Sequence, residues 1–269
     1  PWTDIGLEAL NTTYSQGVAY EAALQGMVLL KNEPNALPLK PGIKLAVVGP
    51  MGNTVQLLFS DYETAGFDNT DTIFTHLADM NTGGTTSYYQ GTTITGPANN
   101  ITAATAAVAA ADATILAIGL DKSQEHEGMD RKDTLLPSGQ EALAAAVFKA
   151  AGKSKPVIVL LCNGGAVSID DLITPASAII EAFNPAQQGP KALSALIFGK
   201  ENRWVSFKPL IKIAARRSMF PPCTTTLTSC MRVIPFQGKL PITIYDKDYS
   251  AKLKIQDMEY HTPPGRTPS

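Results

Sequence analysis

The sequence predicts an α/β fold in which a doubly wound, mostly parallel sheet is sandwiched between helices. Short apolar segments alternate with segments of helical periodicity, as they do in parallel sheets. The apolar segments are continuous, which is typical of strands that are buried on both faces. They cover residues 45–50, 113–120, 157–161 and 177–182. The 269 residues, 44% hydrophobic and 17% charged, suffice for one large α/β domain or two small ones.

The first 40 residues are predicted to form a linker and a leading helix. Residues 1–13 are an extended lead-in with one turn, and the helix begins at Ser15. Its small and apolar residues recur at helical spacing and form a stripe that can lie close against a sheet: Ala19, Ala22, Ala23, Gly26, Met27 and Leu30. Residues 31–35 end this helix, because a proline stands among them.

The remaining helices are predicted from periodicity and from their start signals. Residues 53–100 are polar and rich in Gly and Thr, so long loops are expected there, with one helix near its middle. A later helix is entered at Ser138, and Glu141 three positions on completes a capping box. The predicted helices cover residues 72–80, 101–111, 140–151 and 188–198.

Composition and charge argue against several classes of partner. The formal net charge is -2 and no Lys/Arg stripe is present, so nucleic acid is not an expected partner. No apolar run reaches the length of a spanning helix, so we expect no membrane partner. Cys162, Cys223 and Cys230 form neither a disulfide framework nor a zinc set, and residues 49–54 lack the Lys of a P-loop. No metal and no cofactor are therefore expected.

An acid-rich turn joins the strand at residues 113–120 to the helix that begins at Ser138. Its charged or titratable side chains include Asp121, Glu125, His126, Glu127, Asp130 and Arg131. In an open α/β sheet the loops at the carboxyl ends of the strands line the ligand crevice. This turn is therefore a candidate acid/base site, and a solvated run of surface acids is the alternative interpretation.

Five motifs in a fixed order make the sequence resemble glycoside hydrolase family 3. They are ALQGMVLLKNEPNALPLK, KLAVVGP, EHEGMDR followed by LLPSGQ, PVIVLLCNGGAV and GKLPITIYDKDY. The resemblance is to the second domain of the family, an (α/β)6 sandwich that follows a catalytic barrel. The D-x-S-x-E-x-E spacing of residues 121–127 is similar to that of the xylosidase and arabinofuranosidase branch.

The resemblance implies a retaining glycosidase mechanism that needs two carboxyl groups. In the family the nucleophile is an Asp on the barrel and the acid/base lies on the loop of the second domain. The E-G-x-D-R match assigns the acid/base role to Glu127, and Glu125 is the rival. Asp130 and Arg131 are expected to fix the loop as an ion pair, and His126 is expected to face away from the catalytic acid.

The barrel that carries the nucleophile is missing from this sequence, so we expect the isolated chain not to hydrolyse glycosides. The expected partners are an oligosaccharide or glycoside substrate and the missing N-terminal barrel domain. The alternative function is that of a non-catalytic carbohydrate-binding or vestigial α/β module. The glycosylation sequons at Asn11 and Asn100 favour a secreted or extracellular protein.

Residues 205–237 interrupt the pattern that the resemblance predicts, since the family passes from a sequence like FGKENRW directly to GKLPITIYDKDY. We hypothesise that these residues are a translated intron, and a genuine surface insertion is the alternative. The sandwich domain is then predicted to comprise residues 41–204 and 238–249. Residues 250–269 are predicted to be a tail that leads towards a missing fibronectin-like domain.

Overall fold

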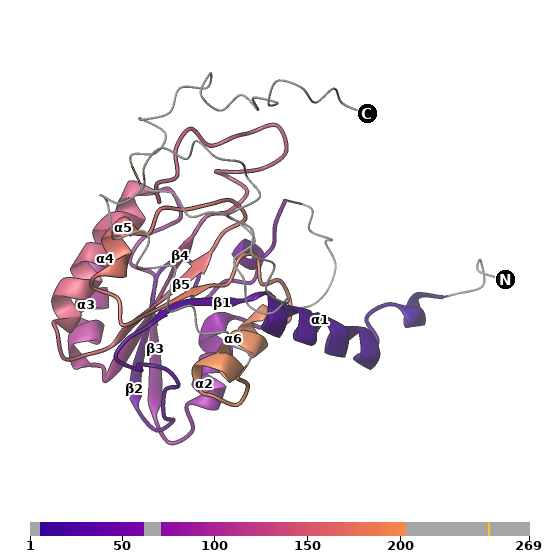
Figure 1. Ribbon diagram of the computed structural model, residues 1–269, viewed down its shortest axis with the longest axis horizontal. Helices are drawn as coiled ribbons and strands as arrows, with labels where there is room; N and C mark the ends of the chain where they lie inside the picture. Colours follow the sequence, from indigo (N-terminus) through magenta and orange to yellow (C-terminus); the bar gives the residue numbers. More distant parts are fainter. Residues whose placement is uncertain (1–5, 62–70, 203–246, 248–269) are drawn as a thin grey trace, which may run out of the picture.

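The computed structural model describes residues 6–61, 71–202 and 247. A six-stranded sheet has the order β1-β6-β5-β4-β2-β3, with every neighbouring pair parallel except β1 with β6 (Figure 1). The strands are β1 Val28–Asn32, β2 Lys44–Val48, β3 Thr85–Tyr89, β4 Ala113–Gly119, β5 Val157–Cys162 and β6 Ala178–Glu181. This topology confirms the predicted mostly parallel α/β fold.

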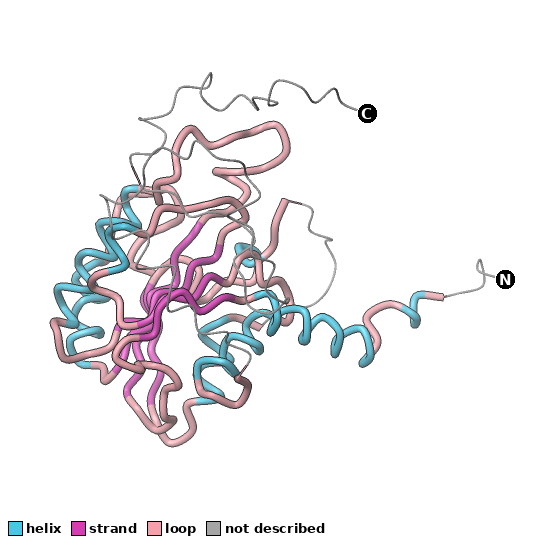
Figure 2. Tube along the Cα trace, in the orientation of Figure 1, coloured by secondary structure: helices cyan, strands magenta, loops and turns pink. Residues whose placement is uncertain are grey.

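Helices cover both faces of the sheet (Figure 2). They are α1 Thr13–Gly26, α2 Ile73–Met80, α3 Ile101–Ala110, α4 Ser138–Ala151, α5 Asp170–Ile173 and α6 Gly189–Ile197, with short 3-10 turns at Leu7–Ala9 and Gln56–Leu58. One apolar core joins the sheet to α2 and α6, and a second joins the opposite face to α3, α4 and α5. Because β4 and β5 are buried along their whole length, they lie at the centre of this sandwich.

The order of the strands reverses between β2 and β4. The chain adds β3 on the outer side of β2 and then crosses back to place β4 on its inner side. The carboxyl ends of β2 and β4 are therefore the topological switch point, where open α/β sheets bind their ligands. The acid-rich turn follows β4 directly and so begins at this point.

Two edge strands were not predicted, and both lie at the rim of the sheet. The predicted leading helix was too long: α1 ends at Gly26, and the next residues form β1, whose antiparallel pairing with β6 buries Val28, Leu29 and Leu30. The polar segment Thr85–Tyr89 forms β3, paired only with β2. Main-chain pairing at a sheet edge thus outweighs the helical spacing and polarity of these segments.

The leading helix also does not lie along the sheet as predicted. Among its residues only Leu24 is buried, and α1 projects from the body of the domain (Figure 1). Tyr14 and Val18 of α1 are exposed apolar side chains four residues apart, so they lie on one side of the helix, and Leu10 before the helix is exposed as well. The predicted helix at residues 72–80 is confirmed, with a capping box between Thr72 and Thr75.

The capping box predicted for Ser138 and Glu141 is wrong. Pro137 occupies the N-cap position, and Ser138 is the first residue of α4, so its hydroxyl is past the place where it could cap the helix. The carbonyl of Pro137 accepts hydrogen bonds from Gln140 and Glu141 instead.

The predicted insertion at residues 205–237, the segment 238–246 and the tail lie outside the described residues.

Gly119 ends β4 in a conformation that requires glycine. Its φ is +155°, and an added Cβ would lie 1.8 Å from the carbonyl oxygen of Cys162 on β5. We expect Gly119→Ala to lower the free energy of unfolding by about 2 to 4 kcal/mol, because the two central strands would have to separate. Urea unfolding measures this loss. Gly17→Ala on α1, where a Cβ meets nothing within 4 Å, is the control and should stabilise slightly.

Candidate active site

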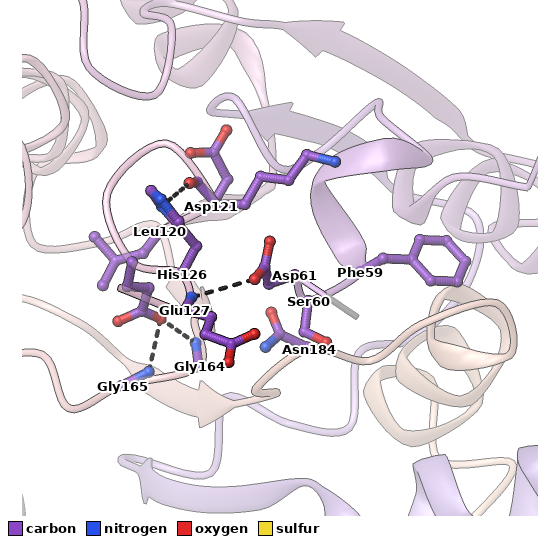
Figure 3. A pocket seen from close by; sticks show the side chains of 12 residues that line it. Phe59, Ser60, Asp61, Leu120, Asp121, His126, Glu127, Gly164, Gly165 and Asn184 are labelled. Carbon is purple, nitrogen blue, oxygen red and sulfur yellow. Dashed lines mark hydrogen bonds between the residues drawn. The ribbon is translucent and has the colours of Figure 1, made fainter. Parts of the chain in front are cut away.

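A cavity of about 270 Å³ opens at the switch point (Figure 3). Four loops supply its walls, and each follows the carboxyl end of a different parallel strand. Its lining residues come from the loops after β2, β4, β5 and β6: Phe59, Ser60, Asp61, Leu120, Asp121, Lys122, Glu125, His126, Glu127, Gly164, Gly165 and Asn184. Both candidate acids, Glu125 and Glu127, therefore lie at the cavity, as the topology of the sheet requires.

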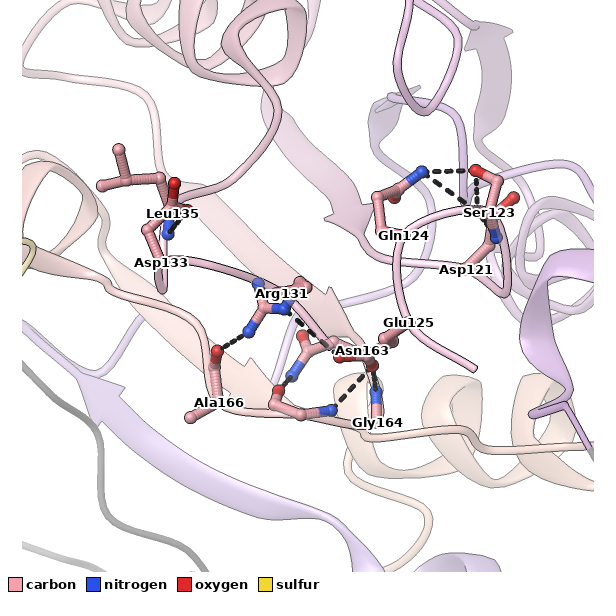
Figure 4. Close-up of polar contacts among 11 residues, drawn as sticks. Asp121, Ser123, Gln124, Glu125, Arg131, Asp133, Leu135, Asn163, Gly164 and Ala166 are labelled. Carbon is pink, nitrogen blue, oxygen red and sulfur yellow. Dashed lines mark hydrogen bonds and ion pairs between the residues drawn. The ribbon is translucent and has the colours of Figure 1, made fainter. Parts of the chain in front are cut away.

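Glu125 is bound by the loop that follows β5 (Figure 4). Its Oε1 accepts hydrogen bonds from the backbone N–H groups of Gly164, at 2.8 Å, and Gly165, at 2.7 Å. Its Oε2 lies 3.3 Å from Nε of Arg131, whose Nη2 donates to the carbonyl of Ala166. These charge-assisted contacts fix the acid-rich turn to the neighbouring loop.

Glu127 stands two residues further along the turn and is exposed at the cavity. Its backbone N–H donates to Oδ2 of Asp61, over 3.2 Å, and this contact joins the turn to the loop after β2. The side chain of Glu127 projects among the residues that line the cavity (Figure 3). The two acids of the E-x-E pair both line the cavity but differ in environment: Glu125 is partly buried and bound by two backbone N–H groups, and Glu127 is exposed.

The start of the turn is shaped by Asp121. Its Oδ1 accepts hydrogen bonds from the backbone N–H of Ser123, at 2.8 Å, and from the hydroxyl of Ser123, at 2.6 Å. This is an Asx turn, in which an aspartate replaces a backbone partner. Asp121 therefore shapes the loop that presents Glu125 and Glu127.

The predictions for the other charged residues of the turn fare differently. Arg131 does form an ion pair that fixes the loop, but its partner is Glu125 rather than the predicted Asp130, because Glu125 folds back over the same loop. His126 lies at the cavity, and its Nδ1 is 3.0 Å from the carbonyl oxygen of Lys122. Cys162 is fully buried, and burial raises the pKa of its thiol far above the usual range.

Gln140 holds the end of β4 where the turn begins. It is fully buried on α4, its Oε1 accepts from the N–H of Gly119 at 2.8 Å, and its Nε2 donates to the carbonyl of Gly119 at 2.8 Å. The same amide nitrogen donates to the carbonyl of Ile94 at 2.9 Å. One side chain thus pairs both the N–H and the carbonyl of Gly119 and ties the end of β4 to the segment after β3.

Gln140→Leu is expected to lower the free energy of unfolding by about 2 to 4 kcal/mol, because it deprives buried backbone groups at Gly119 and Ile94 of their partner. Guanidinium unfolding followed by circular dichroism measures the change. The exposed Gln90 allows the same substitution as a control, with an expected effect within about 0.5 kcal/mol. Equal losses at both positions would contradict the role given to Gln140.

Several residues of the site were missed in the sequence. Asp61, Asn184 and the pair Gly164 and Gly165 come from separate segments, so nothing in their local pattern relates them to the acid-rich turn. Gln140 did carry a signal, because it shares one side of α4 with Leu143, Ala144 and Val147, and that side is buried.

Metal-binding clusters and membrane-spanning helices are both absent from the described residues. No group of three or more His, Cys, Asp or Glu side chains among them could hold a metal ion. No helix in the described part of the chain is long and apolar enough to cross a membrane.

The fold and the cavity define an α/β domain with an acid-bearing crevice at its topological switch point. The family model described as Glycosyl hydrolase family 3 C-terminal domain matches residues 27–204. The chain belongs to glycoside hydrolase family 3, as the five motifs predicted.

Curated relatives include enzymes named as xylosidases. The exo-1,4-beta-xylosidase xlnD of Aspergillus awamori is 35% identical over 212 residues, which are 75% of this chain and 26% of that protein. The beta-xylosidase/alpha-L-arabinofuranosidase 1 of Medicago sativa subsp. varia is 31% identical over 273 residues, 98% of this chain and 30% of the relative. The chain thus spans between a quarter and a third of the length of these relatives.

Solved structures of the family share the fold. A GH3 exo-beta-xylosidase (XlnD), solved with a xylobiose aziridine activity-based probe, has a TM-score of 0.67 and 34% identity and matches 75% of this chain and 26% of its own. A GH3 beta-glucosidase from Bifidobacterium adolescentis has a TM-score of 0.65 and 30% identity, covering 73% of this chain and 29% of its own.

Proposed function

We propose that this chain is the second domain of a retaining, exo-acting beta-glycosidase that hydrolyses beta-xylosides or beta-glucosides in the breakdown of plant-type polysaccharides. In this proposal Glu127 is the general acid/base, and the nucleophilic Asp belongs to a barrel domain of the complete enzyme. The observation that carries the proposal is the contrast between the two acids: both line the cavity, but Glu125 is partly buried and held by Gly164, Gly165 and Arg131, whereas Glu127 is exposed.

The chemistry of glycoside hydrolysis explains why this contrast favours Glu127. The acid/base must first give a proton to the leaving oxygen and then take one from the attacking water. Both oxygens of Glu125 already bind groups of the domain, Oε1 the N–H groups of Gly164 and Gly165 and Oε2 the guanidinium of Arg131. Glu127 can approach a glycosidic oxygen that enters the cavity, while Glu125 holds the turn in place.

The activities for which the relatives are named support the substrate class. They describe enzymes that act on beta-xylosides, and one of the similar structures was solved with a probe derived from xylobiose. A beta-glucosidase has nearly the same TM-score, so glucosides remain within the proposal.

A chimeric enzyme tests the proposal. Residues 27–204 would replace the corresponding domain of the Aspergillus awamori xylosidase, and circular dichroism would establish that the product is folded. We expect the folded chimera to hydrolyse 4-nitrophenyl beta-xyloside and the isolated chain to be inactive, because each domain supplies one of the two carboxyl groups. The alternative, a carbohydrate-binding module, predicts a folded, inactive chimera and xylobiose binding that Glu127→Ala leaves unchanged.

The proposed enzyme is secreted, which is the usual location for an enzyme that acts on polysaccharides. Asn11 and Asn100 of the two sequons are both exposed, so an oligosaccharyltransferase could reach them. Expression through a eukaryotic secretory pathway should yield a product whose mass falls on treatment with an endoglycosidase. Retention of the folded product inside the cell, without glycan, would contradict this part of the proposal.

A further inference from the structure

Glu181 is a buried acid that the proposed reaction does not use. It is the last residue of β6 and only 1% exposed. Its register partners are Val28 on β1 and Leu161 on β5, and neither carries a charge. A buried acid without a cation as partner is rare and usually has a specific cause.

The carboxyl of Glu181 holds the two turns that follow β5 and β6. Its Oε1 accepts a hydrogen bond from the backbone N–H of Phe183, at 3.1 Å, and Phe183 has the unusual φ of +54°. The side-chain amide of Asn163 also hydrogen-bonds to Glu181 and donates to the carbonyl of Gly165 at 2.9 Å. The backbone N–H of Asn163 in turn donates to the carbonyl of Phe183, at 3.1 Å, so the two turns are tied together twice.

Both turns are walls of the cavity. The turn after β5 carries Gly164 and Gly165, whose N–H groups grip Glu125. The turn after β6 carries Asn184, directly after Phe183, into the lining of the same cavity. The buried carboxyl of Glu181 is therefore connected to the turn whose N–H groups bind Glu125 and to the turn that carries Asn184.

The surroundings of Glu181 keep it neutral. Burial raises its pKa to about 8; the hydrogen bonds from Phe183 and Asn163 act in the opposite direction but are outweighed, and the negative charge of Glu125 adds to the effect of burial. Cys162 on β5 is the other titratable neighbour, and it is a buried thiol. The basic side chains of Lys31 and Arg131 bind partners other than Glu181. Lys31 of β1 donates to the carbonyl of Ile173 at 2.7 Å, and Arg131 pairs with Glu125.

We propose that Glu181 is a positioning residue. As a neutral carboxylic acid it couples the turns after β5 and β6, and it thereby sets the geometry of the hydrogen bonds from Gly164 and Gly165 to Glu125. Loss of the proton places a second negative charge behind Glu125 and disfavours this arrangement. Its importance for catalysis rests on the proposed function, whereas the coupling itself is measured on the 269-residue chain without any substrate.

The experiment follows the amide resonances of Gly164 and Gly165 in the full chain labelled with ¹⁵N-glycine, at pH values from 5.5 to 9.5. In the wild-type protein both resonances should titrate with a midpoint near 8. In Glu181→Gln they should keep their low-pH positions and lose the titration, because the amide accepts from Phe183 but cannot ionise. In Glu181→Met, which cannot hold either turn, both resonances should move at every pH.

Two outcomes would overturn the proposal: a titration of Gly164 and Gly165 that persists in Glu181→Gln, or unchanged positions in a folded Glu181→Met. Glu141→Gln is the matched control, because Glu141 also has a raised pKa, caused first by burial, but lies on α4 away from these turns. It should leave the titration unchanged. None of these readouts depends on glycoside hydrolysis, so failure of the proposed function leaves the test intact.

Discussion

Replacing Glu127 by Gln in the chimeric xylosidase is expected to lower kcat/KM for xylobiose by about 100- to 10,000-fold, the usual contribution of a general acid/base. The loss should grow with the basicity of the leaving alcohol. A 4-nitrophenolate leaves without a proton, so 4-nitrophenyl beta-xyloside should lose much less in the glycosylation step than xylobiose. The ratio of the two losses therefore measures acid catalysis and separates it from a change in binding.

Glu125→Gln is the matched control, since it removes a carboxylate only two residues away. Its amide oxygen can still accept from Gly164 and Gly165, but the ion pair with Arg131 is lost. We expect a loss of stability of about 1 to 3 kcal/mol and a similar, modest loss of activity on both substrates. The assignment would be reversed if Glu125→Gln, and not Glu127→Gln, selectively abolished hydrolysis of xylobiose.

The stability of the chain should fall as pH rises from about 5 to 8 because of Glu181. The unfolded chain releases this proton near the ordinary glutamate pKa of 4.5, whereas the folded chain releases it only near 8. Between these values the folded state binds more protons, so the free energy of unfolding decreases by up to about 1.4 kcal/mol per pH unit from this group. Above pH 8 the contribution of Glu181 becomes constant.

Glu181→Gln should remove this contribution, since its side chain has nearly the same shape and no proton to lose. Urea midpoints measured from pH 5 to 9 should be similar for the two proteins at pH 5 and should favour the variant increasingly towards pH 8. Glu21→Gln, an exposed change of equal charge on α1, is the control and should follow the wild type at every pH. Parallel curves for wild type and Glu181→Gln would refute the prediction.

The central strands could be predicted because their environment is uniform. β4 and β5 are buried on both faces, so each reads as an unbroken apolar run in the sequence. The edge strands lack this signature. Thr85–Tyr89 is half exposed and polar, and Val28–Asn32 follows a helix without a break, so only pairing with β2 and β6 defines them as strands.

The position of the candidate acids at the crevice could also be predicted from the sequence, but the difference in environment between the two acids could not. The acid-rich turn follows a buried strand, and the topology brings such a turn to the crevice. The difference between Glu125 and Glu127 depends on Gly164, Gly165 and Asp61, which are distant in sequence. Only one residue separates the two acids along the turn, but contacts with distant segments decide which of them is bound by backbone N–H groups.

The origin of the cavity walls in four separate loops has a consequence for the evolution of this domain. Each loop begins where a strand ends, so an insertion or exchange in one loop leaves the buried layers of the sandwich unchanged. The loop after β2 can vary while the loop after β5 keeps its hydrogen bonds to Glu125. Such a domain can acquire a preference for a different sugar through a local exchange in one wall, with its framework inherited intact.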